Sequence, residues 1–266
     1  MRTRMRPYLS AFRIRAQLEL QYRGAALGGI VTQAFFGLVL VFLYQTLYAD
    51  GDAQRLGETI TYVWLQQSFF RAMFAGESEL NAQIMSGSVA YSLVRPVDQQ
   101  LWWSCRDLAG RCVGCLMRMA PMLAVQLLLP ASCRMSLPES PTALLQFMFS
   151  ITLGMLCLTQ IGSITSAFTM MTLDPRGVAS ILQLTMAFLS GNVIPLTMFP
   201  ESLQSLMRWQ PFAQALDAPI RMYLHAQPLP EFLISVTVQT AWLAAMTLLA
   251  RRLWRAHLDR LVIQGG

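Results

Sequence analysis

The sequence predicts an all-α protein that crosses a membrane several times, and three observations support this fold class. Hydrophobic residues make up 55% of the 266 residues and charged residues only 13%, about half of the charged share usual in soluble domains. Several uncharged apolar runs are long enough to cross a bilayer as helices. The arginines gather in alternate connecting segments, as the positive-inside rule requires of a chain with repeated crossings.

Six apolar runs are predicted as membrane spans. They cover residues 27–48, 59–75, 112–131, 142–173, 178–197 and 232–250. The first is uncharged and would extend roughly 33 Å as a helix. The second is the weakest prediction, because polar residues and Arg71 interrupt it. The fourth is long enough to be tilted or bent.

The distribution of arginine predicts the orientation. Only Arg55, Arg134, Arg208 and Arg221 fall in the segments on one side. The others fall in the N-terminal segment, the loop after the second span with its adjoining helix ends, the turn at 174–177 and the C-terminal tail. Both termini are therefore predicted to be cytoplasmic, with a cytoplasmic tail at 251–266. The net charge of +6 then calls for no nucleic-acid partner.

Residues 1–26 are predicted to form a cytoplasmic interfacial helix. Leu9, Phe12, Ala16 and Leu20 recur at helical spacing, and nearby arginines can face lipid head groups. The alternative is a basic segment that only anchors the topology.

The outer segment is expected to contain short re-entrant helices over residues 198–230. Gly191, Pro195, Pro200 and Pro211 interrupt the apolar pattern at and after the fifth span, and Pro219 is expected to break it again. Irregular backbone at membrane depth is tolerated only when it is buried in protein or lines a cavity.

Several kinds of chemistry find no support in the sequence. All 20 basic residues other than histidine are arginines, so the lysine of a phosphate-binding loop is missing. His225 and His257 are far apart in the sequence and predict no metal site. Cys112 and Cys115 have the spacing of a thiol oxidoreductase, but their place in an apolar run favours packing. No catalytic residue is assigned.

Two motifs resemble those of ABC-2 type transporter permeases. "SGSVAYSLVRPVD" after the second span is similar to the family's "sG-x-x-x-x-LLRP" signature, and "SGNVIPLTMFPESLQSLMRWQPF" at the fifth span is similar to its Gly- and Pro-rich stretch. The predicted spans extend the resemblance along essentially the whole chain, with the drug- and viologen-export subgroup most similar.

This resemblance implies a permease subunit in a bacterial inner membrane that exports an amphipathic or apolar compound. It implies a second permease subunit, identical or related, and cytoplasmic ATPase subunits that bind ATP and Mg²⁺, with no cofactor on this chain. Residues 76–100 would form the segment that couples to the ATPase. Its candidate residues are Glu79, Ser86, Gly87, Leu93, Arg95, Pro96 and Asp98, with Glu77 as a further polar contact. The alternative is a topology anchor and helix stop at Arg95 and Pro96.

Polar residues at membrane depth are candidates for the transport pathway or a permease interface. They are Gln66, Gln67, Arg118, Gln160, Gln183 and Asn192. For Arg118, a role in transport and simple snorkelling toward the inner surface are both open. Two other functions remain as alternatives: an ion-coupled secondary transporter, for which the charge-poor spans offer no buried carboxylate, and an intramembrane thiol oxidoreductase.

Overall fold

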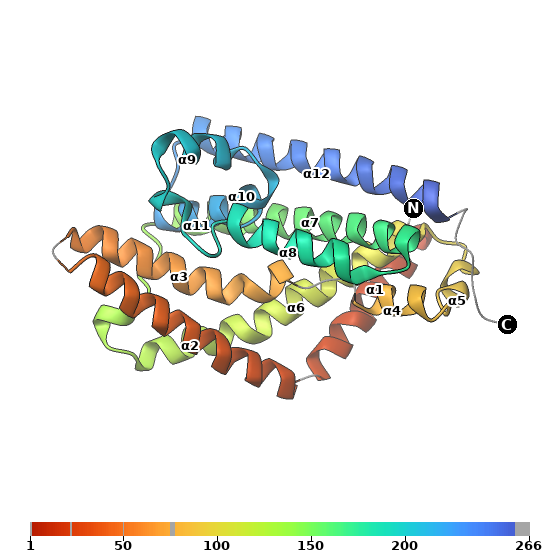
Figure 1. The fold of residues 1–266 in the computed structure, drawn as a ribbon, viewed down its shortest axis with the longest axis horizontal. Helices are drawn as coiled ribbons and strands as arrows, with labels where there is room; N and C mark the ends of the chain where they lie inside the picture. The colour runs from red at the N-terminus through yellow and green to blue at the C-terminus, as the bar shows by residue number, and fades with distance from the viewer. Residues whose placement is uncertain (1, 22, 50, 75–77, 259–266) are drawn as a thin grey trace.

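The computed structural model describes residues 2–21, 23–49, 51–74 and 78–258, and these form an all-helical bundle (Figure 1). The long helices are α1 (Arg2–Gln21), α2 (Arg23–Leu47), α3 (Ala53–Phe74), α6 (Gln99–Leu128), α7 (Pro141–Thr172), α8 (Pro175–Leu189) and α12 (Leu229–Leu258). The short ones are α4 (Ser78–Met85), α5 (Ala90–Leu93), α9 (Glu201–Arg208), α10 (Pro211–Ala215) and α11 (Asp217–Leu224), with 3-10 turns at Ala131–Cys133 and Leu196–Met198.

Local sequence explains where the long helices begin. The side chains of Asp98, Ser140 and Asp174 each accept a backbone hydrogen bond at the start of α6, α7 and α8. Proline occupies the first position of α7 and α8, where its missing N–H costs nothing. Leu173 ends α7 in the left-handed conformation, with φ 52°. The predicted tight turn after residue 173 is thus a C-cap followed directly by an N-cap.

Four of the described helices are long and apolar enough to cross a membrane: residues Leu27–Leu47, Gln99–Gln126, Pro141–Thr172 and Leu229–Leu258. They correspond to the first, third, fourth and sixth predicted spans. The other two predicted spans correspond to α3, which carries three charged side chains, and to α8, which has only 15 residues or roughly 22 Å. The structure therefore supports a multi-pass bundle, and the count of six spans stays a prediction.

The third and fifth spans differ from their predicted bounds. α6 begins at Gln99 instead of residue 112, because its polar first half is buried against other helices. α8 ends at Leu189, before the predicted break at Pro195. Ser190 then leads into Gly191, whose φ of 80° suits glycine. The helix of the fifth span thus ends eight residues, or about two turns, before its predicted end at residue 197.

The short helices lie at opposite ends of the bundle. α4 and α5 occupy one end, beside the start of α1 and the last turns of α12, whereas α9, α10 and α11 gather at the other (Figure 1). We call these the α4–α5 end and the α9–α11 end. At the α4–α5 end, one apolar cluster joins α1, α4, α6, α7 and α12 through Ala11, Leu80, Trp103, Met170 and Trp254.

α1 runs beside the first half of α6. Tyr8 accepts a hydrogen bond from the Asp98 backbone N–H (3.0 Å), and Arg15 lies against Gly110 further along α6. The apolar residues Leu9 and Leu20 face away from the bundle, at 65% and 48% exposure. Phe12 and Ala16 of the same row are partly buried. The row is therefore exposed at Leu9 and Leu20 only, and the interfacial role stays a prediction.

Candidate functional site

The segment between α4 and α6 is a helix, a sharp turn and a second, very short helix. α4 ends at Met85, and Gly87 follows with φ 71°, a conformation that strains any residue with a Cβ atom. The Val89 N–H donates to the Gln83 carbonyl (3.1 Å), which closes the turn. α5 spans only Ala90–Leu93, and Pro96 separates it from α6. The break predicted at Gly87 is therefore present.

An ion pair braces this segment against α6. The Arg106 guanidinium donates to both carboxylate oxygens of Glu79 at 2.6 Å. It also lies over the rings of Trp102 and Trp103, 4.9 and 5.5 Å from their centroids. Arg106 is buried, and its Nε atom has no hydrogen-bond partner among the described residues. The ion pair and the stacking together tie α4 to α6.

Two predicted contact residues are already engaged within the chain. Glu79 is held by Arg106 and does not project freely toward a partner. The Asp98 carboxylate accepts the Leu101 N–H at 2.9 Å and so caps α6. Ser86 bonds locally, with its hydroxyl 2.8 Å from that of Ser88. Glu77 lies outside the described residues.

The rest of the segment is open to its surroundings. Tyr91 and Val94 are 81% and 83% exposed. Arg95 and Pro96 are also exposed, with the Arg95 guanidinium 5.2 Å from the Trp102 ring centroid, and Leu93 is half-buried. A cavity of about 530 Å³ lies beside them, walled by one face of α1, by Glu79 and by Arg106. Apolar and basic groups thus surround a hollow at this end.

At the α9–α11 end, the predicted glycine and proline breaks each have a distinct position. A Cβ atom on Gly191 would lie 2.5 Å from the Tyr62 hydroxyl, so the turn passes closely over α3. Pro195 and Pro200 precede the 3-10 turn and α9, and Pro211 is the first residue of α10. Pro219 lies in the first turn of α11 and breaks nothing, contrary to expectation, because that position needs no N–H donor.

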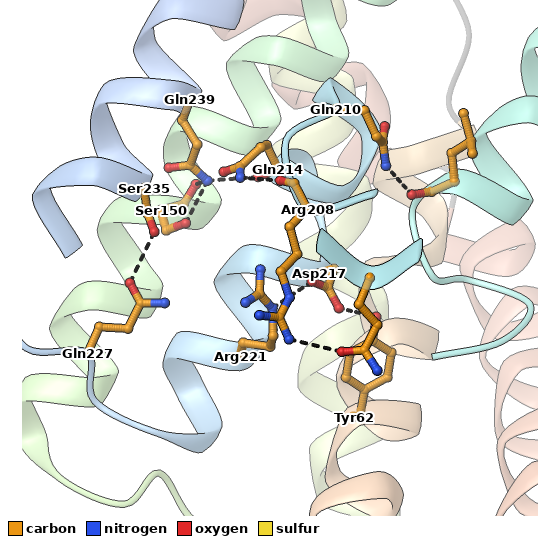
Figure 2. Close-up of polar contacts among 12 residues, drawn as sticks. Tyr62, Ser150, Arg208, Gln210, Gln214, Asp217, Arg221, Gln227, Ser235 and Gln239 are labelled. Carbon is orange, nitrogen blue, oxygen red and sulfur yellow. Dashed lines mark hydrogen bonds and ion pairs between the residues drawn. The ribbon is translucent and has the colours of Figure 1, made fainter. Parts of the chain in front are cut away.

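Buried polar contacts hold α10 and α11 inside the bundle (Figure 2). The fully buried carboxylate of Asp217 accepts from the Tyr62 hydroxyl at 3.0 Å and from Arg221 Nε at 2.6 Å. A second set of contacts joins α12 to α7 and α10: Gln239 Nε2 donates to the Ser150 hydroxyl and to the Gln214 carbonyl, both at 2.7 Å. The close-up shows that these contacts draw α3, α7 and α12 together around α10 and α11.

The candidate pathway residues do not meet in one site. Gln66 donates to the Gly191 carbonyl at 2.8 Å, and Asn192 follows in the same turn. Gln160 accepts from Gln100 at 3.2 Å, whereas Gln183 lies on an exposed part of α8. Gln67 is buried, and neither its Oε1 atom nor the Asn192 Oδ1 atom has a partner among the described residues.

Arg118 is the twentieth of the 30 residues of α6. Its guanidinium lies over Gly29 of α2, where a Cβ atom would come within 2.7 Å of Arg118 Cζ. Gly29 is close to the start of the span at Leu27. Arg118 is therefore deep within its own helix but shallow relative to α2, because α6 extends well beyond α2 at the α4–α5 end.

Two carboxylates are buried among the described residues, and both lie outside the apolar runs that were predicted as spans. Asp107 lies inside α6, buried, with Arg111 Nε 2.5 Å from its Oδ2 atom. Arg111 also donates to the Ala72 carbonyl at the end of α3. The second buried carboxylate is that of Asp217 at the other end. Both are neutralised by an arginine four residues on, as in a structural ion pair.

The cysteines pack within the helices. Cys115 is buried, with its Sγ atom 3.5 Å from the Ser68 carbonyl, and Cys112 is half-buried. His225 lies near Glu58 and Glu139, at 3.3 and 3.8 Å. Within the ranges that the structure describes, no group of three or more potential metal ligands occurs.

Comparison with known proteins gives one family. The sequence model of the family described as "ABC-2 family transporter protein" matches residues 29–265. No relative was found among the curated proteins compared with the sequence. The match begins two residues inside the first of the four helices that are long and apolar enough to cross a membrane, and it covers the other three, the α4–α5 segment and the α9–α11 end. The chain belongs to the ABC-2 transporter family and is a multi-pass membrane protein.

Proposed function

We propose that this chain is the permease subunit of an ATP-driven exporter, in which separate cytoplasmic subunits bind ATP and Mg²⁺ and hydrolyse the nucleotide. Family membership supports a transport role for a membrane subunit. The proposal adds a second permease subunit, identical or related, and an amphipathic or apolar cargo in a drug-export-like pathway. α3 and α8 complete six spans, both termini are cytoplasmic, and the membrane is the bacterial inner membrane.

The observation that carries this proposal is the exposure of apolar side chains on the α4–α5 segment. Tyr91 and Val94 are more than four-fifths exposed, yet they lie outside every helix able to cross a membrane. Exposed apolar groups framed by polar ones are typical of protein contact sites. Arg95, beside them, adds a charge for orientation.

The position of the cavity supports a soluble partner. Its wall on α1 is formed by Pro7, Ser10 and Ile14. At about 100° per residue, this face lies opposite the exposed apolar residues Leu9 and Leu20. If the apolar row rests on the membrane, the cavity opens toward the cytoplasm. An ATPase subunit that contacts Tyr91 and Val94 would then lie against it.

The α4–α5 segment is attached to α6 at two points, so a movement of the segment is passed on to the bundle. Asp98 caps α6 immediately after the segment, and Arg106 ties α4 to the same helix. A partner that displaces α5 therefore moves α6 with it. We propose that closure of two ATPase subunits moves both permeases in this way and opens a path toward the α9–α11 end, which faces outward.

The experiment is a charge reversal on the segment with a matched reversal elsewhere. Arg95→Glu should abolish co-purification with the co-expressed ATPase subunit and impair transport, and Gly87→Pro should do the same by straining the turn. Arg176→Glu, at an exposed position in the first turn of α8, is the control and should leave both unchanged. Membrane insertion is followed by fractionation. Normal transport and ATPase binding by both variants would contradict the proposal.

A further inference from the structure

A row of charged side chains follows one face of α6 where four helices meet. Arg15 of α1 lies against Gly110, and Glu19 of α1 and Arg71 of α3 lie against Gly114, one turn further. Arg118 is the next position on the same face. Gly29 of α2 completes the site, because its missing side chain leaves room for the Arg118 guanidinium.

The charges in this row do not balance. Glu19 is shared by two arginines, Arg15 at 3.0 Å and Arg71 at 3.1 Å. Asp107, on the same side of α6, pairs with Arg111 and also lies within electrostatic reach of Arg15 and Arg71. Arg118 lies within electrostatic reach of both Glu19 and Arg71 but forms no ion pair with a described residue. Among the described residues, two carboxylates, Glu19 and Asp107, thus serve four guanidinium groups, and the excess charge is positive.

The row lies at the edge of the membrane. Gly29 comes two residues, or roughly 3 Å of helix, after Leu27, where the first span begins. Arg71 lies in the last turn of α3. Lipid phosphates are found at this level, and an arginine there extends its head group toward them. Arg118 is only partly buried, so the site is open to a ligand.

We propose that Arg118, with Arg71, binds the phosphate of an anionic phospholipid in the leaflet at the α4–α5 end. A phosphate accepts two parallel hydrogen bonds from one guanidinium, which makes arginine well suited to such a head group. The excess positive charge of the row favours an anionic lipid over a zwitterionic one. The inference depends on the membrane spans alone, and neither an ATPase nor a transported compound enters it.

The experiment measures lipid binding by the full chain in detergent. Native mass spectrometry or a thermal-shift titration compares phosphatidylglycerol, phosphatidylcholine and inorganic phosphate. The wild type should bind phosphatidylglycerol in preference to phosphatidylcholine. Arg118→Gln should weaken phosphatidylglycerol binding by about tenfold or more, since a charge-assisted pair is lost. Arg251→Gln removes an exposed arginine from α12 and should have no effect.

A second variant tests the site without removing charge. Gly29→Ala places a methyl group where the Arg118 guanidinium lies and forces this flexible group to shift. It should also weaken phosphatidylglycerol binding, by less than Arg118→Gln, and it provides the test if Arg118→Gln does not fold. Unchanged lipid preference in Gly29→Ala and Arg118→Gln would overturn the assignment. Equal binding of inorganic phosphate would assign the site to a free anion instead. Loss of ATPase binding would bear only on the proposed function.

Discussion

Replacing Gly191 by alanine should destabilise the α9–α11 end by about 2–5 kcal/mol. The residue has φ 80°, where a Cβ atom costs about 1–2 kcal/mol. That atom would also lie 2.5 Å from the Tyr62 hydroxyl and 3.2 Å from Leu196 Cγ. Relief of such a contact in a packed interior costs about 1–3 kcal/mol. If Tyr62 moves instead, its 3.0 Å hydrogen bond to Asp217 is lost.

The assay is reversible unfolding in mixed micelles, with the unfolded fraction followed by far-ultraviolet circular dichroism as the share of denaturing detergent rises. Gly57→Ala is the matched control: this glycine lies within α3, and nothing lies near its missing Cβ atom. It should be neutral or gain up to about 1 kcal/mol. A stability of Gly191→Ala within about 0.5 kcal/mol of the wild type would refute the steric reasoning, given the strain expected in that turn.

Three further changes test other contacts. Arg106→Gln should lower the free energy of unfolding by about 1–2 kcal/mol, because Glu79 loses its partner. The loss is limited because the Glu79 carboxylate is exposed enough to be hydrated. An unchanged free energy of unfolding would mean that the ion pair does not stabilise the position of α4. Gln239→Leu should cost about 2 kcal/mol by leaving buried acceptors unpaired, measured in the same micelles. Substituting Cys112 and Cys115 together by serine should leave transport unchanged, and lost transport would revive the thiol chemistry.

Uniformly apolar helices were accessible to sequence reasoning. α7 agrees with its predicted span within one residue at each end, because an uncharged run of that length has few other structures open to it. α12 contains its predicted span but continues eight residues beyond it. The full extent of α6 could not be predicted from the sequence, since its first half carries Arg106, Asp107 and Arg111. These residues are buried by pairing with one another and with other helices, which no local pattern reveals.

Some residues of the candidate sites could also be identified from the sequence, and others could not. Gly87 and Gly191 were identified from sequence because a glycine within an apolar stretch often marks a backbone break, and both have positive φ. Asp217 and Tyr62 were missed, although Asp217 and Arg221 have the i,i+4 spacing of a helical pair. Their contact joins residues 155 positions apart. Such a pairing depends on how the helices pack, and a single sequence carries no periodic signal for it.

The extra length of α6 has a mechanical consequence. It is one 30-residue helix, roughly 45 Å long, that starts at the Asp98 cap and continues past Arg118 to Leu128. A hydrogen-bonded helix resists compression along its axis, so a push at one end arrives at the other as translation or tilt. Pro121 interrupts the ladder near the far end, where a bend is cheapest. The hydrogen bond that Pro121 removes is the one to the Met117 carbonyl, so the helix is least stiff in the turn that contains Arg118.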